Sequence, residues 1–306
     1  MRIAVTGATG LIGKALVPAL EHAGHSVIRL VRKAPVRPLD VQWNPARGEL
    51  DALALGPIEA AIHLAGENVG DGRWSAARKR RIKDSRVDGT RTLVRALATL
   101  SERVARPATL LSASAVGFYG TQPEGDDRAL TESAPPGHDF LADVCQAWEH
   151  EAKQAEALGV RVVLMRTGVV LADDGGVLAR LLRPFRLGLG GKIGGGRQWM
   201  SWVSLDDVVR AYVAIVNDDS YTGPVNIVAP NPVTQAEFAK TLAHVLHRPS
   251  LVPLPKLLVK AAFGEMGERV VLEGQRVVPR VLTEHGFTWK HPRLELAIRD
   301  ILKRLA

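Results

Sequence analysis

Residues 6–13, which read TGATGLIG, are the segment that most constrains the fold of this chain. They follow a short apolar run at residues 3–5 and precede an amphipathic stretch, the order of a strand, a tight turn and a helix. Gly7 and Gly10 would let the backbone turn and approach a pyrophosphate, and Gly13 would let the helix pack closely on the strand. The first N–H groups of such a helix are unpaired and attract anions. The segment therefore predicts a dinucleotide site, although its G-x-x-G-x-x-G spacing differs from the G-x-G-x-x-G of many dehydrogenases.

The composition is that of a folded chain in a reducing compartment. The 306 residues are 46% hydrophobic and 24% charged, which suits two domains or one large α/β domain with an appendage. No apolar run reaches the ~18 residues of a membrane span, and the early first strand leaves no space for a signal peptide. Cys145 is the only cysteine, so neither an internal disulfide nor a cysteine-based zinc site is expected. These features predict a cytoplasmic protein without a metal.

The net charge of +8 and a basic run at residues 78–83 raise the question of a nucleic-acid partner. The run lies in a helix that we expect over residues 75–100, where Ile82, Leu93 and Leu97 share one face. This pattern is typical of a helix with a buried stripe and a solvated basic face. No interleaved aromatic residues or known nucleic-acid motif accompany it, so we expect no nucleic-acid partner, while the phosphates of a cofactor could use the same charge.

Short apolar runs recur along the first part of the chain, and segments of helical composition separate them. They lie at residues 3–5, 27–31, 60–64, 109–111 and 162–164. This β-α-β alternation predicts an α/β fold with a Rossmann-type doubly wound parallel sheet. Because ligands of such sheets bind at the carboxyl ends of the strands, residues that follow each strand are the candidates for a site.

Two changes of composition suggest the domain organisation. We expect a Rossmann domain over residues 1–230, with a glycine-rich insertion on the substrate side near residues 172–204, and a smaller α+β domain over residues 231–306. Within the insertion, residues 188–196 hold six glycines and predict a lip that orders around a ligand. The residues that we expect to contact a substrate are Glu67, Lys192, Gln198 and Trp199.

The residues after the second and third expected strands bear on which dinucleotide binds. Arg32 and Lys33 stand where an NAD-selective protein places a carboxylate for the adenosine ribose. A guanidinium there can instead bind a 2′-phosphate through two hydrogen bonds, which favours NADP, although a solvated basic turn is the alternative. Leu64, Ala65 and Gly66 follow the third strand, and the small residues among them would let the backbone approach the cofactor.

Several motifs resemble those of a known family. TGATGLIG, HLAG (63–66) and SASAVGFYG (112–120) resemble the extended short-chain dehydrogenases/reductases, the group of the nucleotide-sugar epimerases and dehydratases. More specifically, the chain resembles the atypical epimerase-family proteins, which carry a C-terminal domain of unknown function. The segments that carry this likeness are 64–74, 83–90, 166–171, 184–203 and 229–242, with 263–266, 273–280 and 285–289 for the C-terminal domain. The resemblance implies a Rossmann fold, NADP(H) as cofactor and a small substrate-side domain.

The chain departs from the active members of that group at the catalytic pair. In those relatives a Tyr-x-x-x-Lys pair on a helix supplies an acid/base phenol and a lysine that lowers the phenol pKa and holds the nicotinamide ribose. If Glu149 is aligned with the glutamate that commonly follows, the tyrosine position falls on Leu141 and the lysine position on Cys145. Leucine has no proton to transfer, and a neutral thiol supplies no fixed charge.

Ser114 and Tyr119 are the residues that we predict to move a proton in place of that pair. Relatives place a serine or threonine at the position of Ser114 to hydrogen-bond the substrate oxygen, and capping a turn is its alternative role. Tyr119 could supply a phenol from another direction, or pack beside Phe118.

Two arginines are further candidates for cofactor contacts. Arg86 stands where relatives carry an asparagine, so its charge could partly replace that of the absent lysine. Arg166 follows a strand, at a position where relatives pass the nicotinamide of the cofactor. Alternatively, its guanidinium could hold loops in place through hydrogen bonds to backbone carbonyls. The full set of predicted cofactor-binding residues is Gly7, Thr9, Gly10, Leu11, Ile12, Gly13, Arg32, Lys33, Leu64, Ala65, Gly66, Arg86, Ser112, Arg166, Val169 and Val170.

Two functions follow from these observations. One is an NADP(H)-dependent epimerase or oxidoreductase that acts on a nucleotide-sugar-like or other small carbonyl substrate by transient hydride transfer. The other is a catalytically silent NADP(H)-binding sensor or regulatory protein, which the loss of the Tyr-x-x-x-Lys pair favours. Both expect a small-molecule ligand, with no membrane partner, and both leave the oligomeric state open.

Overall fold

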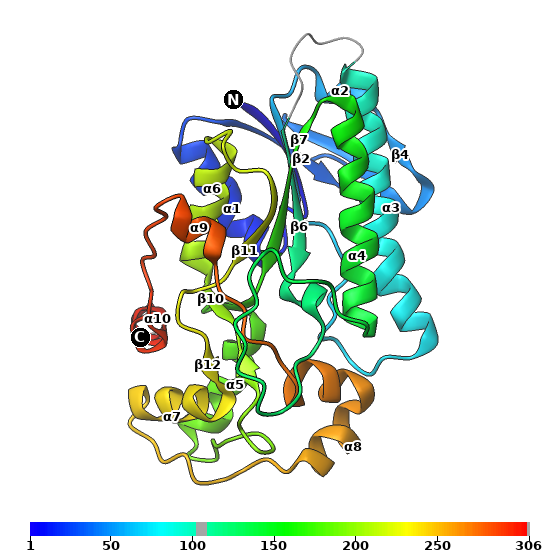
Figure 1. The fold of residues 1–306 in the computed structure, drawn as a ribbon. Coiled ribbons are helices and arrows are strands. Elements are labelled where there is room, and N and C mark those ends of the chain that lie inside the picture. Colours follow the sequence, from blue (N-terminus) through cyan, green and yellow to red (C-terminus); the bar gives the residue numbers. More distant parts are fainter. Residues whose placement is uncertain (102–108, 305–306) are drawn as a thin grey trace.

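The computed structural model describes residues 1–101 and 109–304. Its centre is an eight-stranded sheet in the order β11-β7-β6-β5-β1-β2-β3-β4 (Figure 1). All neighbouring strands of this sheet are parallel except β3 and β4, which pair antiparallel. The strands are β1 (Arg2–Thr6), β2 (Ser26–Val31), β3 (Asp40–Asn44), β4 (Glu49–Leu50), β5 (Ala60–His63), β6 (Thr109–Ala115), β7 (Arg161–Thr167) and β11 (Gly223–Ile227). This arrangement confirms the predicted doubly wound parallel sheet.

Helices cover both faces of the sheet, and two further strand pairs form separate two-stranded sheets. The helices are α1 (Leu11–His22), α2 (Ala52–Leu55), α3 (Ala76–Ser101), α4 (Phe140–Lys153), α5 (Gly176–Arg186), α6 (Leu205–Val216), α7 (Gln235–Val245), α8 (Lys256–Gly267), α9 (Arg280–Glu284) and α10 (Leu294–Lys303). The strand β8 (Val169–Leu171) pairs with β10 (Trp202–Ser204), and β9 (Trp199–Met200) pairs with β12 (Val233–Thr234). No helix in the described ranges has both the length and the hydrophobicity that a membrane crossing requires.

The two faces of the sheet bury separate apolar clusters, because the side chains of each strand alternate between them. Along β6, Leu111 joins the cluster under α1 and α6, whereas Leu110 joins the cluster under α2, α3 and α4. Both leucines are fully buried. Burial on both faces explains why these strands appear in the sequence as continuous apolar runs rather than as an alternating pattern.

The helix α3 has the orientation that its sequence predicted. Ile82 is fully buried, while Arg80, Arg81 and Lys83 are exposed. Lys79 forms an ion pair of 2.6 Å with Glu265 of α8, so the basic run also ties the sheet domain to the C-terminal part of the chain.

A third apolar cluster joins the predicted insertion to the predicted C-terminal domain. Phe185 of α5, Phe238 of α7 and Ile298 of α10 pack together in it. These helices lie beside and below the lower edge of the sheet in Figure 1, where they form a second lobe with α8. The domain boundary after residue 230 stays a prediction, since elements from both sides of it share this core.

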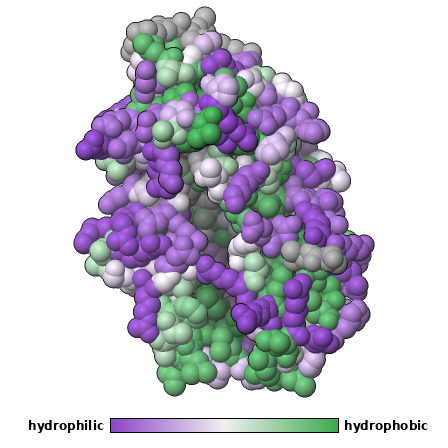
Figure 2. All heavy atoms as spheres, turned by 180° about the vertical axis from the view of Figure 1, so that it is seen from behind, coloured by the Kyte–Doolittle hydropathy of each residue, from purple (hydrophilic) through white to green (hydrophobic). Residues whose placement is uncertain are grey.

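Figure 2, which shows the molecule from behind, has hydrophobic residues gathered at the lower end and a hollow near the middle of the face. Large apolar side chains that are exposed in the second lobe include Leu187, Leu189, Leu251 and Leu257. Leu187 and Leu189 follow α5, Leu251 precedes α8, and Leu257 is its second residue.

Candidate cofactor and substrate site

The glycine turn between β1 and α1 has the backbone geometry that its sequence predicted. Gly7 has a φ of +67°, and the N–H of Gly10 donates to its carbonyl at 2.9 Å. A Cβ on Gly13 would lie 2.2 Å from the same carbonyl oxygen, so only glycine lets α1 approach the strand this closely. Gly10 caps α1 without a side-chain hydrogen bond, which leaves the first N–H groups of a 12-residue helix for an anion. The cradle therefore fits a pyrophosphate.

Thr6 fixes the neighbouring loop against this turn. Its Oγ1 accepts the N–H groups of Leu64 at 3.0 Å and Ala65 at 3.1 Å, so its own proton goes to Nδ1 of His63, 2.8 Å away. Burial lowers the pKa of His63 to about 3, with a smaller contribution from the charge of Arg86, and the ring is neutral. Two of the predicted cofactor residues thus lie beside Gly7, held by a threonine and a histidine that the sequence reasoning did not single out.

Arg32 and Lys33 directly follow β2, and both are exposed. Across residues 1–101 and 109–304, no carboxylate forms an ion pair with either. Asp40 organises the loop that leads away from them. Its carboxylate accepts from Nε and Nη2 of Arg29, both at 2.7 Å, and from the N–H groups of Val36 and Arg37. The two basic side chains are therefore free to meet a phosphate at the end of β2.

Replacing Asp40 with asparagine should lower the free energy of unfolding by about 2 kcal/mol at neutral pH. The hydrogen bonds from Arg29 lower the pKa of this carboxyl from 3.8 to about 2, so the folded state favours the ionised form. That stabilisation is complete above the unfolded-state pKa and is lost as the pH falls toward the folded-state value. Urea unfolding of both proteins at several pH values checks this, and a difference that stays constant down to the lowest pH would contradict it.

An inner cavity of about 210 Å³ lies between the carboxyl ends of the strands and the second lobe. It brings together Arg86 and Val169, predicted for the cofactor, with Gln198 and Trp199, predicted for the substrate. Its further lining residues are Val69, Ala115, Val116, Gly117, Leu141, Val144, Cys145, Trp148, Met200, Ser201, Gln235, Arg269, Val270, Val271, Glu273, Gly274 and Gln275. The sequence reasoning missed the contribution of residues 269–275.

Leu141 and Cys145, at the positions of the missing tyrosine and lysine, both line this cavity. Burial raises the pKa of the Cys145 thiol to about 12, with a further rise from the charge of Glu149. The group is therefore a neutral thiol at physiological pH and a poor nucleophile. The wall that would carry the acid/base pair is apolar.

Arg86 supplies the charge on that wall. Its Nη1 donates to the backbone carbonyls of Glu67 and Ile82, both at 3.0 Å, and the guanidinium lies 5.0 Å from the ring centroid of Trp148. A Cβ on Gly66 would lie 3.1 Å from its Cζ, so this glycine makes space for the arginine. Burial lowers the pKa of Arg86, but a guanidinium stays protonated in proteins. The site thus holds a fixed cation near the position of the absent lysine.

Ser114, Tyr119 and Arg166 lie in a buried hydrogen-bond network rather than on the cavity wall. Ser114 Oγ donates to Oε1 of Glu149 at 2.7 Å, and Arg166 binds both oxygens of that carboxylate at 2.8 Å. Tyr119 donates to Asn226 at 2.7 Å and accepts from Arg166 at 3.0 Å. Burial raises the pKa of Tyr119 against the opposing effect of Arg166, so its phenol is neutral. The catalytic roles of Ser114 and Tyr119 stay predictions, and the contacts give both hydroxyls a structural role.

The remaining predicted residues are not among those that line the inner cavity. Ser112 is fully buried in β6, and Val170 is partly buried in β8, while Thr9 is exposed at the glycine turn. The carboxylate of Glu67 forms ion pairs with Arg78 and Arg81 of α3. Leu11 and Ile12, in the first turn of α1, and Lys192, which is exposed in the glycine-rich segment, complete the set.

An outer cavity of about 300 Å³ adjoins the inner one and shares Gln198, Trp199, Glu273 and Gly274 with it. Arg197 and Lys256 also line it, and Lys256 forms an ion pair of 3.2 Å with Glu124. Residues 197–199, which follow the predicted glycine-rich lip, line these spaces, whereas no residue of 188–196 is among those that line either cavity.

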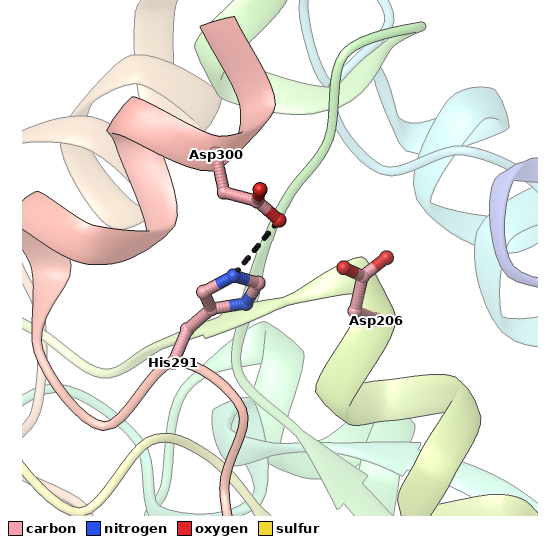
Figure 3. Close-up of side chains that lie close together, drawn as sticks. All are labelled: Asp206, His291 and Asp300. Atoms are coloured by element: carbon pink, nitrogen blue, oxygen red, sulfur yellow. Dashed lines mark hydrogen bonds and ion pairs between the residues drawn. The ribbon is translucent and has the colours of Figure 1, made fainter. Parts of the chain in front are cut away.

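Asp206, His291 and Asp300 converge beside α6 and α10 (Figure 3) and have the residue types of a metal site. His291 Nε2 lies 3.1 Å from Oδ2 of Asp300. Lys290 and Arg304 form ion pairs with both carboxylates, including distances of 2.7 Å from Lys290 to Asp206 and 2.9 Å from Arg304 to Asp300. Because these cations already neutralise the carboxylates, we infer that the cluster has a structural role and holds α10 against α6.

Two family models match the chain. The NAD dependent epimerase/dehydratase family matches residues 3–228, and a domain of unknown function (DUF1731) matches residues 254–301. The second match covers α8, α9 and most of α10.

Proteins of similar sequence and structure carry the same family description. Epimerase family protein Mb2239 of Mycobacterium bovis is 44% identical over 289 residues, which cover 94% of this chain and 93% of that protein. Epimerase family protein YfhF of Bacillus subtilis is 37% identical and covers 99% of this chain and 98% of its own length. The solved structure of human epimerase family protein SDR39U1 (isoform 2) with NADPH has a TM-score of 0.87 and 32% identity, and covers 99% of both chains. The chain therefore belongs to the NAD-dependent epimerase/dehydratase family.

Proposed function

We propose that this protein binds NADP(H) and acts as an epimerase or oxidoreductase on a nucleotide-sugar-like or other small carbonyl compound. When bound, the cofactor would supply transient hydride transfer. The observation that carries this proposal is the cradle of Gly7, Gly10 and Gly13 at the uncapped start of α1, followed at the end of β2 by two cations that form no ion pair with the described residues. The likeness to human SDR39U1, solved with NADPH, supports it.

Different residues of this chain would bind different parts of the cofactor. The first N–H groups of α1 would bind the pyrophosphate, and Arg32 with Lys33 would bind the 2′-phosphate. Val169 and Arg86, which line the inner cavity, would lie at the nicotinamide end. The fixed charge of Arg86 would serve there in place of the missing lysine.

A small-molecule substrate is the partner that we propose, with no nucleic acid or membrane, and the cytoplasm as the compartment. The contacts of the basic run in α3 support this part of the proposal. Arg78 and Lys79 are engaged in ion pairs with Glu67 and Glu265. Because these two cations already pair with carboxylates of the protein, their charge does not require a polyanionic partner.

The rival function is an NADP(H)-binding sensor without turnover, and a specific observation favours it. Leu141 and Cys145 replace the usual pair, and the hydroxyls of Ser114 and Tyr119 are engaged with Glu149 and Asn226. These contacts leave proton transfer to a substrate without a donor. A protein that only binds the cofactor needs no such transfer.

Incubation of the purified protein with its cofactor and a panel of nucleotide sugars, aldehydes and ketones decides between the two, when both the absorbance of NADPH and the conversion of each substrate by NMR are followed. Turnover with any member supports the enzyme, and Tyr119→Phe and Ser114→Ala in the same assay test the two predicted proton donors. Tight binding of NADPH with neither net consumption of the cofactor nor conversion of any substrate across the whole panel would favour the sensor.

A further inference from the structure

We propose that the inner cavity binds the apolar, ring-sized body of a carbonyl compound, whose oxygen accepts a hydrogen bond from Arg86, rather than a polyhydroxylated sugar. This ligand class rests on the proposed function, since it narrows the substrate at the same site. The cavity lies where the nicotinamide end of the cofactor would be, and it has one charge without a counter-charge on a mainly apolar wall.

The wall of the inner cavity is made mainly of hydrocarbon and aromatic side chains. They come from the end of β6 and the turn after it, from the buried face of α4, from β8 and β9, from the loop after β5, and from the segment that follows α8. The apolar lining residues are Val69, Ala115, Val116, Leu141, Val144, Trp148, Val169, Met200, Val270 and Val271. Burying a hydroxyl against such a wall without a partner costs about 1–3 kcal/mol, so a sugar ring would lose more than it gains there.

The polar side chains around the cavity are already hydrogen-bonded within the protein. Gln275 Nε2 donates to the carbonyl of Val116 at 2.9 Å. Gln198 Nε2 donates to the carbonyls of Ile193 and Val271, both at 3.1 Å. Ser201 Oγ donates to the carbonyl of Gln275 at 2.8 Å. These bonds fix the lip and leave few donors for the several hydroxyls of a sugar.

The charged pairs lead to the same conclusion. Arg269 and Glu273 form an ion pair of 2.8 Å on the cavity wall and compensate each other. Arg86 differs, because no carboxylate of the described residues lies within ion-pair distance of it, and its Nη1 contacts only backbone carbonyls. The nearby carboxylate of Glu67 is engaged with Arg78 and Arg81 instead.

Arg86 is a partly buried cation without a counter-charge, so its free N–H groups favour a ligand oxygen that carries partial or full negative charge. In the inner cavity that oxygen would be the only strongly polar atom of the ligand that needs a partner. The volume of about 210 Å³ suits one or two rings, and a longer ligand would continue past Trp199 into the outer cavity.

Calorimetric titration of the protein, saturated with NADP⁺, with three probes tests this ligand class. The probes are 2-acetylnaphthalene, its hydrocarbon counterpart 2-ethylnaphthalene, and UDP-glucose. We expect the ketone to bind about tenfold more tightly than the hydrocarbon, because a hydrogen bond to a charged donor is worth about 1.5–3 kcal/mol. UDP-glucose should bind more weakly than the ketone.

Two variants of Arg86 test whether this residue donates the hydrogen bond that distinguishes the ketone from the hydrocarbon. Arg86→Leu should weaken the ketone about tenfold and leave the hydrocarbon unchanged, while Arg86→Lys should keep part of the difference. Lys83→Leu removes an exposed cation from the same helix and should change nothing. Leu141→Trp, which fills the cavity without touching Arg86, should abolish binding of both naphthalenes and keeps the test informative if the Arg86 variants do not fold.

Tighter binding of UDP-glucose than of the ketone would overturn the proposal, as would equal affinity for the ketone and the hydrocarbon, or no binding of either naphthalene. A titration with NADP⁺ precedes each experiment, and it tests the proposed function separately from the ligand class of the cavity. If NADP⁺ does not bind, the proposed function fails, and the same probes added without cofactor still test the cavity.

Discussion

Replacing Gly13 with alanine should lower the free energy of unfolding by about 3 kcal/mol and abolish NADPH binding. The added Cβ would lie 2.2 Å from the carbonyl oxygen of Gly7 and 2.7 Å from Cα of Ala8. Both atoms belong to the backbone of the turn, so no side chain can rotate to relieve the clash. The helix would have to move away from β1, and its first N–H groups would leave the position in which they bind a phosphate.

Gly24→Ala is the matched control for this prediction. Gly24 has a φ of +84°, but a Cβ there would meet no atom within 4 Å. The substitution therefore carries only the backbone penalty of about 1–2 kcal/mol, and cofactor binding should be unchanged. Denaturant unfolding and NADPH titration of both variants measure the two effects. A Gly13→Ala protein as stable as the Gly24→Ala protein, with normal NADPH affinity, would contradict the close packing that we infer.

The second large effect is expected at the buried ion pair of Glu149 and Arg166. Either Glu149→Leu or Arg166→Met should destabilise the fold by about 3–5 kcal/mol, because each leaves a charge buried without its partner. The two side chains are 3% and 4% exposed, and they are joined by two hydrogen bonds of 2.8 Å. Ser114 and Tyr119 would each lose a partner as well.

The double variant Glu149→Leu with Arg166→Met should recover much of this loss, since it removes both charges together. Asp71→Ala is the control, because its ion pair with Arg180 is exposed and worth less than about 1 kcal/mol. Urea unfolding of the wild type, the two single variants and the double variant completes the cycle, and Asp71→Ala is measured beside them. Additive losses in the double variant, or single losses no larger than that of Asp71→Ala, would contradict the coupling between the two charges that we infer.

The parts of the fold that the sequence predicted are those that depend on neighbouring residues. The glycine turn, the buried strands and α3 each follow from a local pattern, and the structure has them within a few residues of the expected positions. Leu141 and Cys145 also fall on the cavity wall, because helical spacing from Glu149 places them there. Patterns of neighbouring residues were therefore enough to predict these features.

The partners of the site residues could not be predicted, because they come from distant segments. Ser114 and Glu149 are 35 positions apart, and Tyr119 and Asn226 are 107 apart. One signal was present in the sequence: Glu149 lies at helical spacing from Cys145 and Ala152 on the buried stripe of α4, and a carboxylate there requires a cation. The contribution of residues 269–275 depends on how the C-terminal segment packs, which no local pattern encodes.

The affinities of the wild-type protein for NADPH and NADH, measured side by side by calorimetry, test the central claim most directly. We predict that NADPH binds at least about tenfold more tightly, because charged hydrogen bonds from the cations after β2 to the 2′-phosphate are worth about 1.5–3 kcal/mol each. Arg32→Ala should remove most of that preference and leave the affinity for NADH unchanged. Equal affinities for the two cofactors, or no binding of either, would contradict the account.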